Sequence, residues 1–177
     1  MNGQQVHLRP MTVEDTSKIV AWRNKEFVRH NFIYQKPFTK EGHLRWIEEQ
    51  VKPGHVVQFI ICLADGREIG SVYFRDIDRA AQTAEYGIFI GEEDALGCGY
   101  GSQTARLALE YAFGTLGLQK VYLRFVEGNI GARKSYENAG FQMIRDKQDT
   151  VLLEQGERQV FFMEIERETW CARNAKS

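Results

Sequence analysis

The sequence predicts an α/β protein with a central, mixed and mostly antiparallel sheet of about seven strands, flanked by about four helices. The turn pair Asp65-Gly66 joins two segments rich in β-branched and aromatic residues, which is typical of an antiparallel hairpin. Apolar residues recur at helical spacing between Ala105 and Leu116, which indicates an amphipathic helix. Lys120–Val126 alternates in character, so we expect a strand there, beside that helix.

The other strands are expected in the segments that turn or breaker residues delimit. The first stops at Pro10, and the last two are joined around Gln155-Gly156. In chain order, the expected strands are Val6–Arg9, Val56–Leu63, Glu68–Asp76, Ala84–Ile90, Lys120–Val126, Gln142–Glu154 and Arg158–Glu166.

Capping and stop residues delimit the expected helices. Thr12, Thr39 and Asn129 are suitable N-caps, and Gly117 and Gly140 are suitable stops. The expected helices lie between Thr12 and Asn24, Thr39 and Pro53, Gln103 and Leu116, and Asn129 and Gly140. Residues 171–177 are expected to form a frayed tail.

The composition is that of an ordinary globular protein. Of 177 residues, 43% are hydrophobic and 27% charged, so we expect residues 1–177 to form a single domain. The formal net charge of −1 gives no general attraction to nucleic acid or to an anionic membrane. The sequence has no apolar run of the ~18 residues that a membrane span needs and no signal-peptide pattern at its start. We therefore expect a cytoplasmic protein with neither a nucleic-acid nor a membrane partner.

The cysteines and histidines indicate neither a disulfide framework nor a metal site. Cys62, Cys98 and Cys171 are far apart and odd in number, so we expect free thiols. The four histidines show no metal-ligand spacing.

A glycine-rich loop precedes the amphipathic helix. Gly97, Gly99 and Gly101 alternate with other residues, and such a loop at a helix N-terminus can direct backbone N–H groups at a phosphate. A dinucleotide fingerprint would need glycine at Ser102 or Thr104, and a P-loop would need a Gly-Lys-Ser/Thr sequence that is absent. We therefore expect this loop to bind the pyrophosphate of a ligand that neither a dinucleotide fingerprint nor a P-loop recognises.

Two motifs in this order resemble the GCN5-related N-acetyltransferase (GNAT) family. Gly99 and Gly101 match the two small positions of the family's first motif, whereas Leu96 stands where the family usually has Gln or Arg. The second motif is similar to the segment formed by Asn129, Ala132, Tyr136-Glu137 and Gly140-Phe141. The ends of the chain resemble the RimJ/RimL-type branch, which acetylates ribosomal-protein N-termini and many small amines, on the residues Leu8-Arg9-Pro10, Gly156–Val160 and Glu168-Thr169-Trp170.

The resemblance implies the GNAT fold and transfer of an acetyl group from acetyl-CoA to a primary amine, by direct attack through a tetrahedral intermediate. Tyr136 is then the general acid and Glu85 the base, acting directly or through water. Ordinary packing is the alternative for Tyr136, and a solvated charge is the alternative for Glu85. The implied cofactor-binding residues are Ile88, Phe89 and Ile90 for the pantetheine arm, Gly97, Cys98, Gly99, Tyr100, Gly101 and Ser102 for the pyrophosphate, and Asn129, which also caps its helix.

The acceptor is open between a protein N-terminus and a small amine. Trp22-Arg23-Asn24 and His43–Ile47 also resemble acetyltransferases that act on amino groups of nucleotide-linked sugars, although a core role for Trp22 is the alternative. The candidate acceptor-binding residues are Trp22, Arg23, Asn24 and Phe32. A non-catalytic acyl-CoA-binding module is the competing class of protein, and the resemblance leaves a homodimer open.

Overall fold

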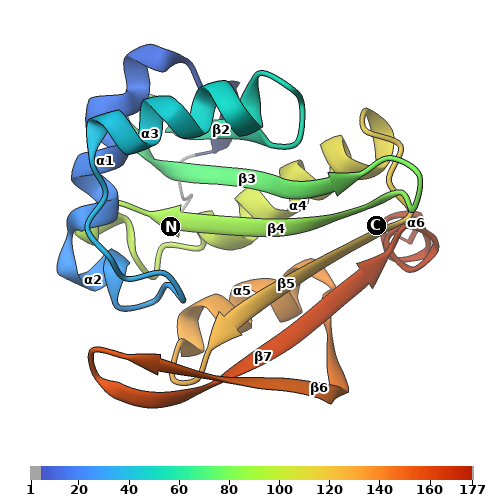
Figure 1. The fold of residues 1–177 in the computed structure, drawn as a ribbon. Helices are drawn as coiled ribbons and strands as arrows, with labels where there is room; N and C mark the ends of the chain where they lie inside the picture. The colour runs from blue at the N-terminus through green and yellow to red at the C-terminus, as the bar shows by residue number, and fades with distance from the viewer. Residues whose placement is uncertain (1–4, 177) are drawn as a thin grey trace.

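The computed structural model describes residues 5–176, which form one sheet of seven strands in the order β1-β2-β3-β4-β5-β7-β6 (Figure 1). β4 and β5 run parallel, and every other neighbouring pair is antiparallel. The predicted mixed and mostly antiparallel sheet is confirmed. The strands are β1 (Val6–Pro10), β2 (Val57–Leu63), β3 (Glu68–Asp78), β4 (Thr83–Ile90), β5 (Lys120–Val126), β6 (Gln142–Leu153) and β7 (Gly156–Glu166).

Six α-helices lie in residues 5–176, so the expected number of four was too low. One addition is a single turn, α2, which is separate because Lys25 adopts an extended backbone and ends the preceding helix. The helices are α1 (Thr16–Asn24), α2 (Glu26–Arg29), α3 (Lys40–Trp46), α4 (Tyr100–Gly114), α5 (Ile130–Ala139) and α6 (Arg167–Asn174).

The second addition, α6, corrects the expected frayed tail. Residues 171–174 are helical, and only the short stretch after Asn174 lies outside the helix, with Ser177 outside the described residues. α6 docks because Trp170 packs on Phe113 of α4, with ring centroids 5.6 Å apart. Arg173 also donates a hydrogen bond to the Asn138 carbonyl oxygen at 3.3 Å. These partners are distant in sequence, so local pattern did not reveal them.

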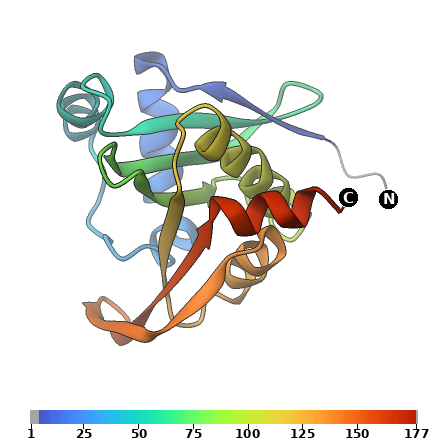
Figure 2. The ribbon, with the colours of Figure 1, turned by 90° about the vertical axis from the view of Figure 1, so that its right-hand side faces the viewer.

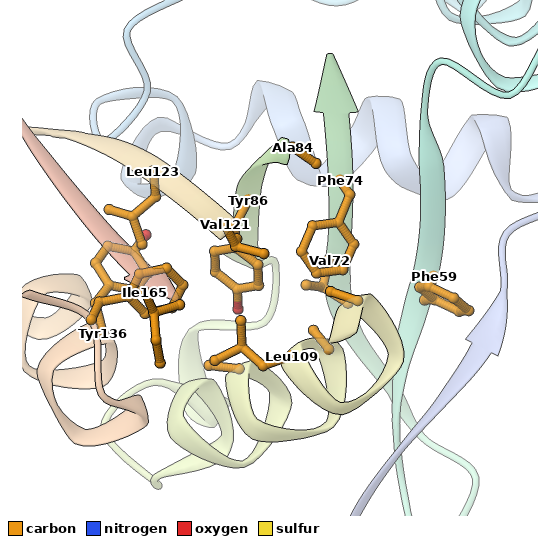
Figure 3. Packing of buried hydrophobic residues seen from close by; sticks show 14 of the residues in the cluster. Phe59, Val72, Phe74, Ala84, Tyr86, Leu109, Val121, Leu123, Tyr136 and Ile165 are labelled. Carbon is orange, nitrogen blue, oxygen red and sulfur yellow. The ribbon is translucent and has the colours of Figure 1, made fainter. Parts of the chain in front are cut away.

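The helices cover both faces of the sheet (Figure 2). The larger core lies between the sheet and α4, where Leu109 packs among side chains such as Val72, Tyr86 and Val121 (Figure 3). A smaller core on the opposite face joins Ile19 and Trp22 of α1 to β2 and β4. Side chains alternate between the two faces along β4, so one strand contributes to both cores.

None of the helices in residues 5–176 combines the length and hydropathy that a membrane span requires. Over the same residues, no three His, Cys, Asp or Glu side chains are grouped as metal ligands. Cys62, Cys98 and Cys171 are free thiols, as predicted.

Candidate functional site

The central feature of the candidate site is a wedge between β4 and β5. The two strands pair only over Thr83–Glu85 and Lys120–Tyr122, after which β5 continues to pair with β7 and β4 with β3. Figure 1 shows the two strands diverging. Within residues 5–176, no strand pairs with the β5-facing edge of Tyr86–Ile90. This edge therefore offers backbone N–H and C=O groups to an extended ligand that carries amides.

A glycine cradle follows the free end of β4. Gly97 and Gly99 have φ angles of +71° and +81°, and a Cβ atom at either would meet no described heavy atom within 4 Å. These glycines thus serve the backbone conformation and leave the space beside them open. Gly99 precedes α4 and provides no side-chain cap, so the first N–H groups of that helix are available to an anion.

The side chains around the cradle leave it accessible. Leu96 is 46% exposed, and Cys98 is exposed, with its thiol directed at the carbonyl oxygens of Asp94 and Leu96 at 3.7 and 3.6 Å. Tyr100 is partly buried and packs against the larger core. The donors that this loop offers to an anion are the backbone N–H groups at the start of α4.

Close contact between α4 and α5 fixes the cradle relative to the next helix. A Cβ atom at Gly101 would lie 2.6 Å from the Ser135 Oγ atom, so any larger residue at this position requires the Ser135 hydroxyl to move. The hydroxyls of Ser102 and Ser135 lie 3.4 Å apart, and the Asn138 side-chain amide lies 3.5 Å from the Ser102 hydroxyl. At the other end, Asn129 caps α5, since its Oδ1 atom accepts the Ala132 N–H at 3.4 Å.

α5 directs Tyr136 at the sheet (Figure 3). Tyr136 is 6% exposed, and its ring packs with Tyr86, Phe125 and Phe141 at centroid distances of 6.1 Å each. Burial, followed by the nearby Tyr73 hydroxyl, raises the pKa of Tyr136. The hydroxyl is therefore protonated at neutral pH and can act as a hydrogen-bond or proton donor. Packing and proton donation are compatible at this position.

Glu85 lies at the vertex of the wedge, on the sheet face opposite α4. It is 8% exposed, so the alternative of a merely solvated charge was wrong. Arg124 donates to its two carboxylate oxygens at 2.8 and 3.3 Å, and the Arg75 Nε atom lies 3.8 Å away. The alternation of Tyr122, Arg124 and Val126 along β5 shows that Arg124 shares this face, but the partner across the sheet depends on a register that the sequence does not reveal.

Two of the candidate acceptor-binding residues have their polar groups in internal contacts. The Trp22 indole donates to Glu92 at 2.6 Å and covers Gly91, where a Cβ atom would lie 2.2 Å from the ring. Asn24 exchanges two hydrogen bonds with the backbone of Phe38, at 2.9 and 2.7 Å. Trp22 thus belongs to the core, as its alternative interpretation held, and Asn24 fixes the loop after α2.

Arg23 and Phe32, the other two candidate acceptor-binding residues, contact each other in a cluster of aromatic rings. Arg23 is 7% exposed, and its guanidinium carbon lies 3.3 Å from the ring centre of Phe32, 4.4 Å from that of Phe38 and 5.7 Å from that of Phe89. The buried Nη1 atom has no hydrogen-bond partner in residues 5–176. Burial lowers the Arg23 pKa to about 10, so the side chain remains charged at neutral pH.

Tyr73 was not singled out by the sequence pattern. Its ring covers Gly87 of β4, where a Cβ atom would lie 2.3 Å from the ring and 2.5 Å from the hydroxyl oxygen. Tyr73 therefore reaches across β4 toward the wedge. Only the pairing of β3 with β4, which places Tyr73 opposite Gly87, reveals this contact.

Comparison with known proteins identifies relatives over most of the chain. Residues 5–142 match the acetyltransferase (GNAT) domain family. The chain is 29% identical over 142 residues to the uncharacterized protein MJ1062 of Methanocaldococcus jannaschii, a match that covers 78% of this chain but 28% of that protein. It is 28% identical over 150 residues to the probable N-acetyltransferase YjcK of Bacillus subtilis, covering 80% and 82% of the two chains.

The fold also matches solved structures. Spermidine N-acetyltransferase from Vibrio cholerae, in complex with CoA and spermine, superposes with a TM-score of 0.86 and 22% sequence identity. The match covers 94% of this chain and 98% of that chain. At this identity the similarity shows a common fold.

The close approach of α4 and α5 gives a testable consequence. Gly101→Val places methyl groups against Ser135, so we expect the free energy of unfolding to fall by about 1–3 kcal/mol. Urea denaturation measures the change, and Ser135→Gly in the same chain should restore part of it. Gly114→Ala is the control, because a Cβ atom there meets no described heavy atom within 4 Å. Equal effects of Gly101→Val and Gly114→Ala would contradict the packing role of Gly101.

Proposed function

The chain belongs to the GNAT acetyltransferase family, and from this premise we propose that it acetylates a primary amine in the wedge between β4 and β5. It is an acetyl-CoA-dependent N-acetyltransferase. We assign it to the RimJ/RimL-type branch, with a protein N-terminus or a small amine as acceptor. The observation that carries the location of the reaction is the end of β4–β5 pairing at Glu85 and Tyr122.

The described residues fit acetyl-CoA. The open space beside Gly97 and Gly99 and the uncapped start of α4 suit a pyrophosphate, while the unpaired edge of β4 suits the amides of the pantetheine arm. When bound, acetyl-CoA supplies the activated acetyl thioester. Gly97–Ser102 would hold the pyrophosphate, and Ile88–Ile90 would hold the arm, with Asn129 beside it. Leu96 is compatible with this cradle because backbone N–H groups provide the donors.

Tyr136 supplies a proton in this proposal. Its raised pKa keeps the hydroxyl protonated, and α5 places it at the wedge from the α4 side of the sheet. The hydroxyl can donate to a departing sulfur as negative charge develops there. Backbone N–H groups on the free edge of β4 can donate to a carbonyl oxygen in the same wedge.

Glu85 receives the amine proton in this proposal, through a bridging water. Both of its oxygens already accept hydrogen bonds from Arg124, so a direct approach by the amine would displace that contact. Glu85 is the last residue of β4 that pairs with β5, and the unpaired segment Tyr86–Ile90 begins directly after it. The Arg124 contact also fixes the orientation of the carboxylate.

Binding of acetyl-CoA is the first test. At a hundred times its Kd, a ligand that binds only the folded state adds about 2.7 kcal/mol of stability. We expect a clear rise of Tm in thermal unfolding with acetyl-CoA and none with NAD. A chain without that rise would lack the cofactor site, and the proposed function would fail.

Tyr136→Phe tests proton donation. Loss of the hydroxyl should lower kcat by about 10²–10⁴-fold while acetyl-CoA affinity changes little, because the ring still fills its site. Steady-state kinetics and acetyl-CoA titration measure the two quantities. Tyr111→Phe is the matched control, since Tyr111 packs on Phe59 away from the wedge. Unaltered turnover in Tyr136→Phe would remove Tyr136 from the mechanism.

Glu85→Gln tests the proton acceptor. The acceptor amine is increasingly protonated as the pH falls from about 9 to about 6, so the loss of turnover should grow over that range. Glu110→Gln, an exposed change on α4, serves as control. A loss of equal size at every pH would instead make Glu85 a positioning residue for Arg124.

A further inference from the structure

We infer that the acceptor carries an anionic group, a carboxylate or a phosphate, that binds the Arg23 guanidinium. This inference rests on the proposed function and narrows its acceptor to amines of one charge type. The evidence is the environment of Arg23, a buried cation held by aromatic rings, together with its position next to the free part of β4.

Arg23 lacks the partner that a buried charge normally has. Its Nη1 atom is buried and has no hydrogen-bond partner among residues 5–176. The titratable groups that interact with it electrostatically are the phenols Tyr73 and Tyr34. Burial raises the Tyr73 pKa, so that hydroxyl is neutral at neutral pH. An unpaired cation in such surroundings is costly, and an anionic ligand would offset that cost.

Three aromatic rings lie close to the Arg23 guanidinium. Phe32 and Phe38 lie within 4.4 Å of the guanidinium carbon, and Phe89 completes the cluster. Ring faces attract a cation but do not accept hydrogen bonds as a carboxylate does. The N–H groups at the edge of the guanidinium therefore keep their donor capacity. This planar set of donors matches the oxygens of carboxylate and phosphate groups.

The position of the cluster links it to the acceptor. Phe89 belongs to the segment of β4 whose β5-facing edge is unpaired, and its side chain lies on the same sheet face as Glu85. Asn24 fixes the backbone at Phe38, so the aromatic cluster is built into the fold. One end of an acceptor could thus contact Arg23 while its amine lies beside the wedge.

The neighbouring charges favour the same type of acceptor. On this face Glu85 has two cationic neighbours, Arg75 and Arg124, and Arg29 of α2 lies 3.4 Å from Glu154 of the carboxyl-terminal hairpin. Arg75 also pairs with Asp76 at 3.1 Å, so the charges around Glu85 balance, whereas the groups that interact electrostatically with Arg23 include no carboxylate. A polyamine would meet repulsion at Arg23, whereas an amine with an anionic end would meet a complementary charge.

Four acceptors that share a primary amine and a similar spacer, but differ in the group at the other end, test the inference: γ-aminobutyrate, aminopropyl phosphate, aminopropanol and diaminopropane. We expect kcat/KM to be about tenfold or more higher for at least one of the two anionic amines than for aminopropanol, as one charge-assisted contact predicts. Diaminopropane should be the poorest acceptor. The ranking of the carboxylate and phosphate compounds identifies the anion.

Arg23→Gln should lower the ratio of anionic to neutral kcat/KM at least about tenfold, through a higher KM for the anionic amine. Arg23→Lys keeps the charge without the planar donor set and should give an intermediate ratio. Arg45→Gln, the same change at an exposed position of α3, is the matched control and should preserve the wild-type ratio.

A binding measurement on amine-free anions does not depend on turnover, and with the wild-type protein it does not depend on the folding of a variant. Butyrate or propyl phosphate should raise the Tm of the wild-type protein with acetyl-CoA present, and should do so less in Arg23→Gln. Equal acetylation of the anionic and neutral amines, without that rise, would overturn the inference while leaving the acetyltransferase function intact. Absence of acetyl-CoA binding would instead contradict the proposed function.

Discussion

The candidate site depends on one constraint in the sheet, the end of hydrogen bonding between β4 and β5 after Glu85 and Tyr122. β5 pairs with β7 along its whole length, and β4 stays with β3, so neither strand can follow the other. Unpaired backbone groups inside a sheet are costly unless a ligand or water satisfies them. The fold thereby leaves an unpaired strand edge in its centre, with paired strands on both sides and helices on both faces.

The glycines near this edge meet different requirements. Gly97 and Gly99 have positive φ angles and open space beside them, so they permit a backbone shape, whereas Gly101 permits the approach of α5 at Ser135. Because Tyr136 lies on α5, the approach at Gly101 also sets where the phenol meets the wedge. The proposed anion cradle and the proposed proton donor are therefore joined through one helix contact, so we expect strain at that contact to affect both.

The sequence was informative where the signal is local. Alternation, β-branched residues and turn residues located the seven strands, and Asp65-Gly66 located a hairpin. Glycine spacing located the loop before α4, whose role as an anion cradle stays a prediction. It failed where a residue's environment depends on distant partners. The docking of α6 needs Phe113, and the partners of Glu85 follow from the register of β3, β4 and β5. A resemblance suggested Arg23 as a candidate, but only the tertiary structure shows that its buried Nη1 atom lacks a partner among residues 5–176.

In the proposed role, burial of Arg23 lowers the stability of the ligand-free protein and provides a recognition site for an anion. Stacking on aromatic rings stabilises a desolvated guanidinium by about 2 kcal/mol, while removal of a charge from water costs several kcal/mol. The remaining cost weakens the empty protein and is relieved when an anion binds, so it favours anionic over neutral ligands. A leucine or methionine would fill the space between Phe32 and Phe38 without that cost. The presence of arginine here is therefore better explained by recognition than by packing.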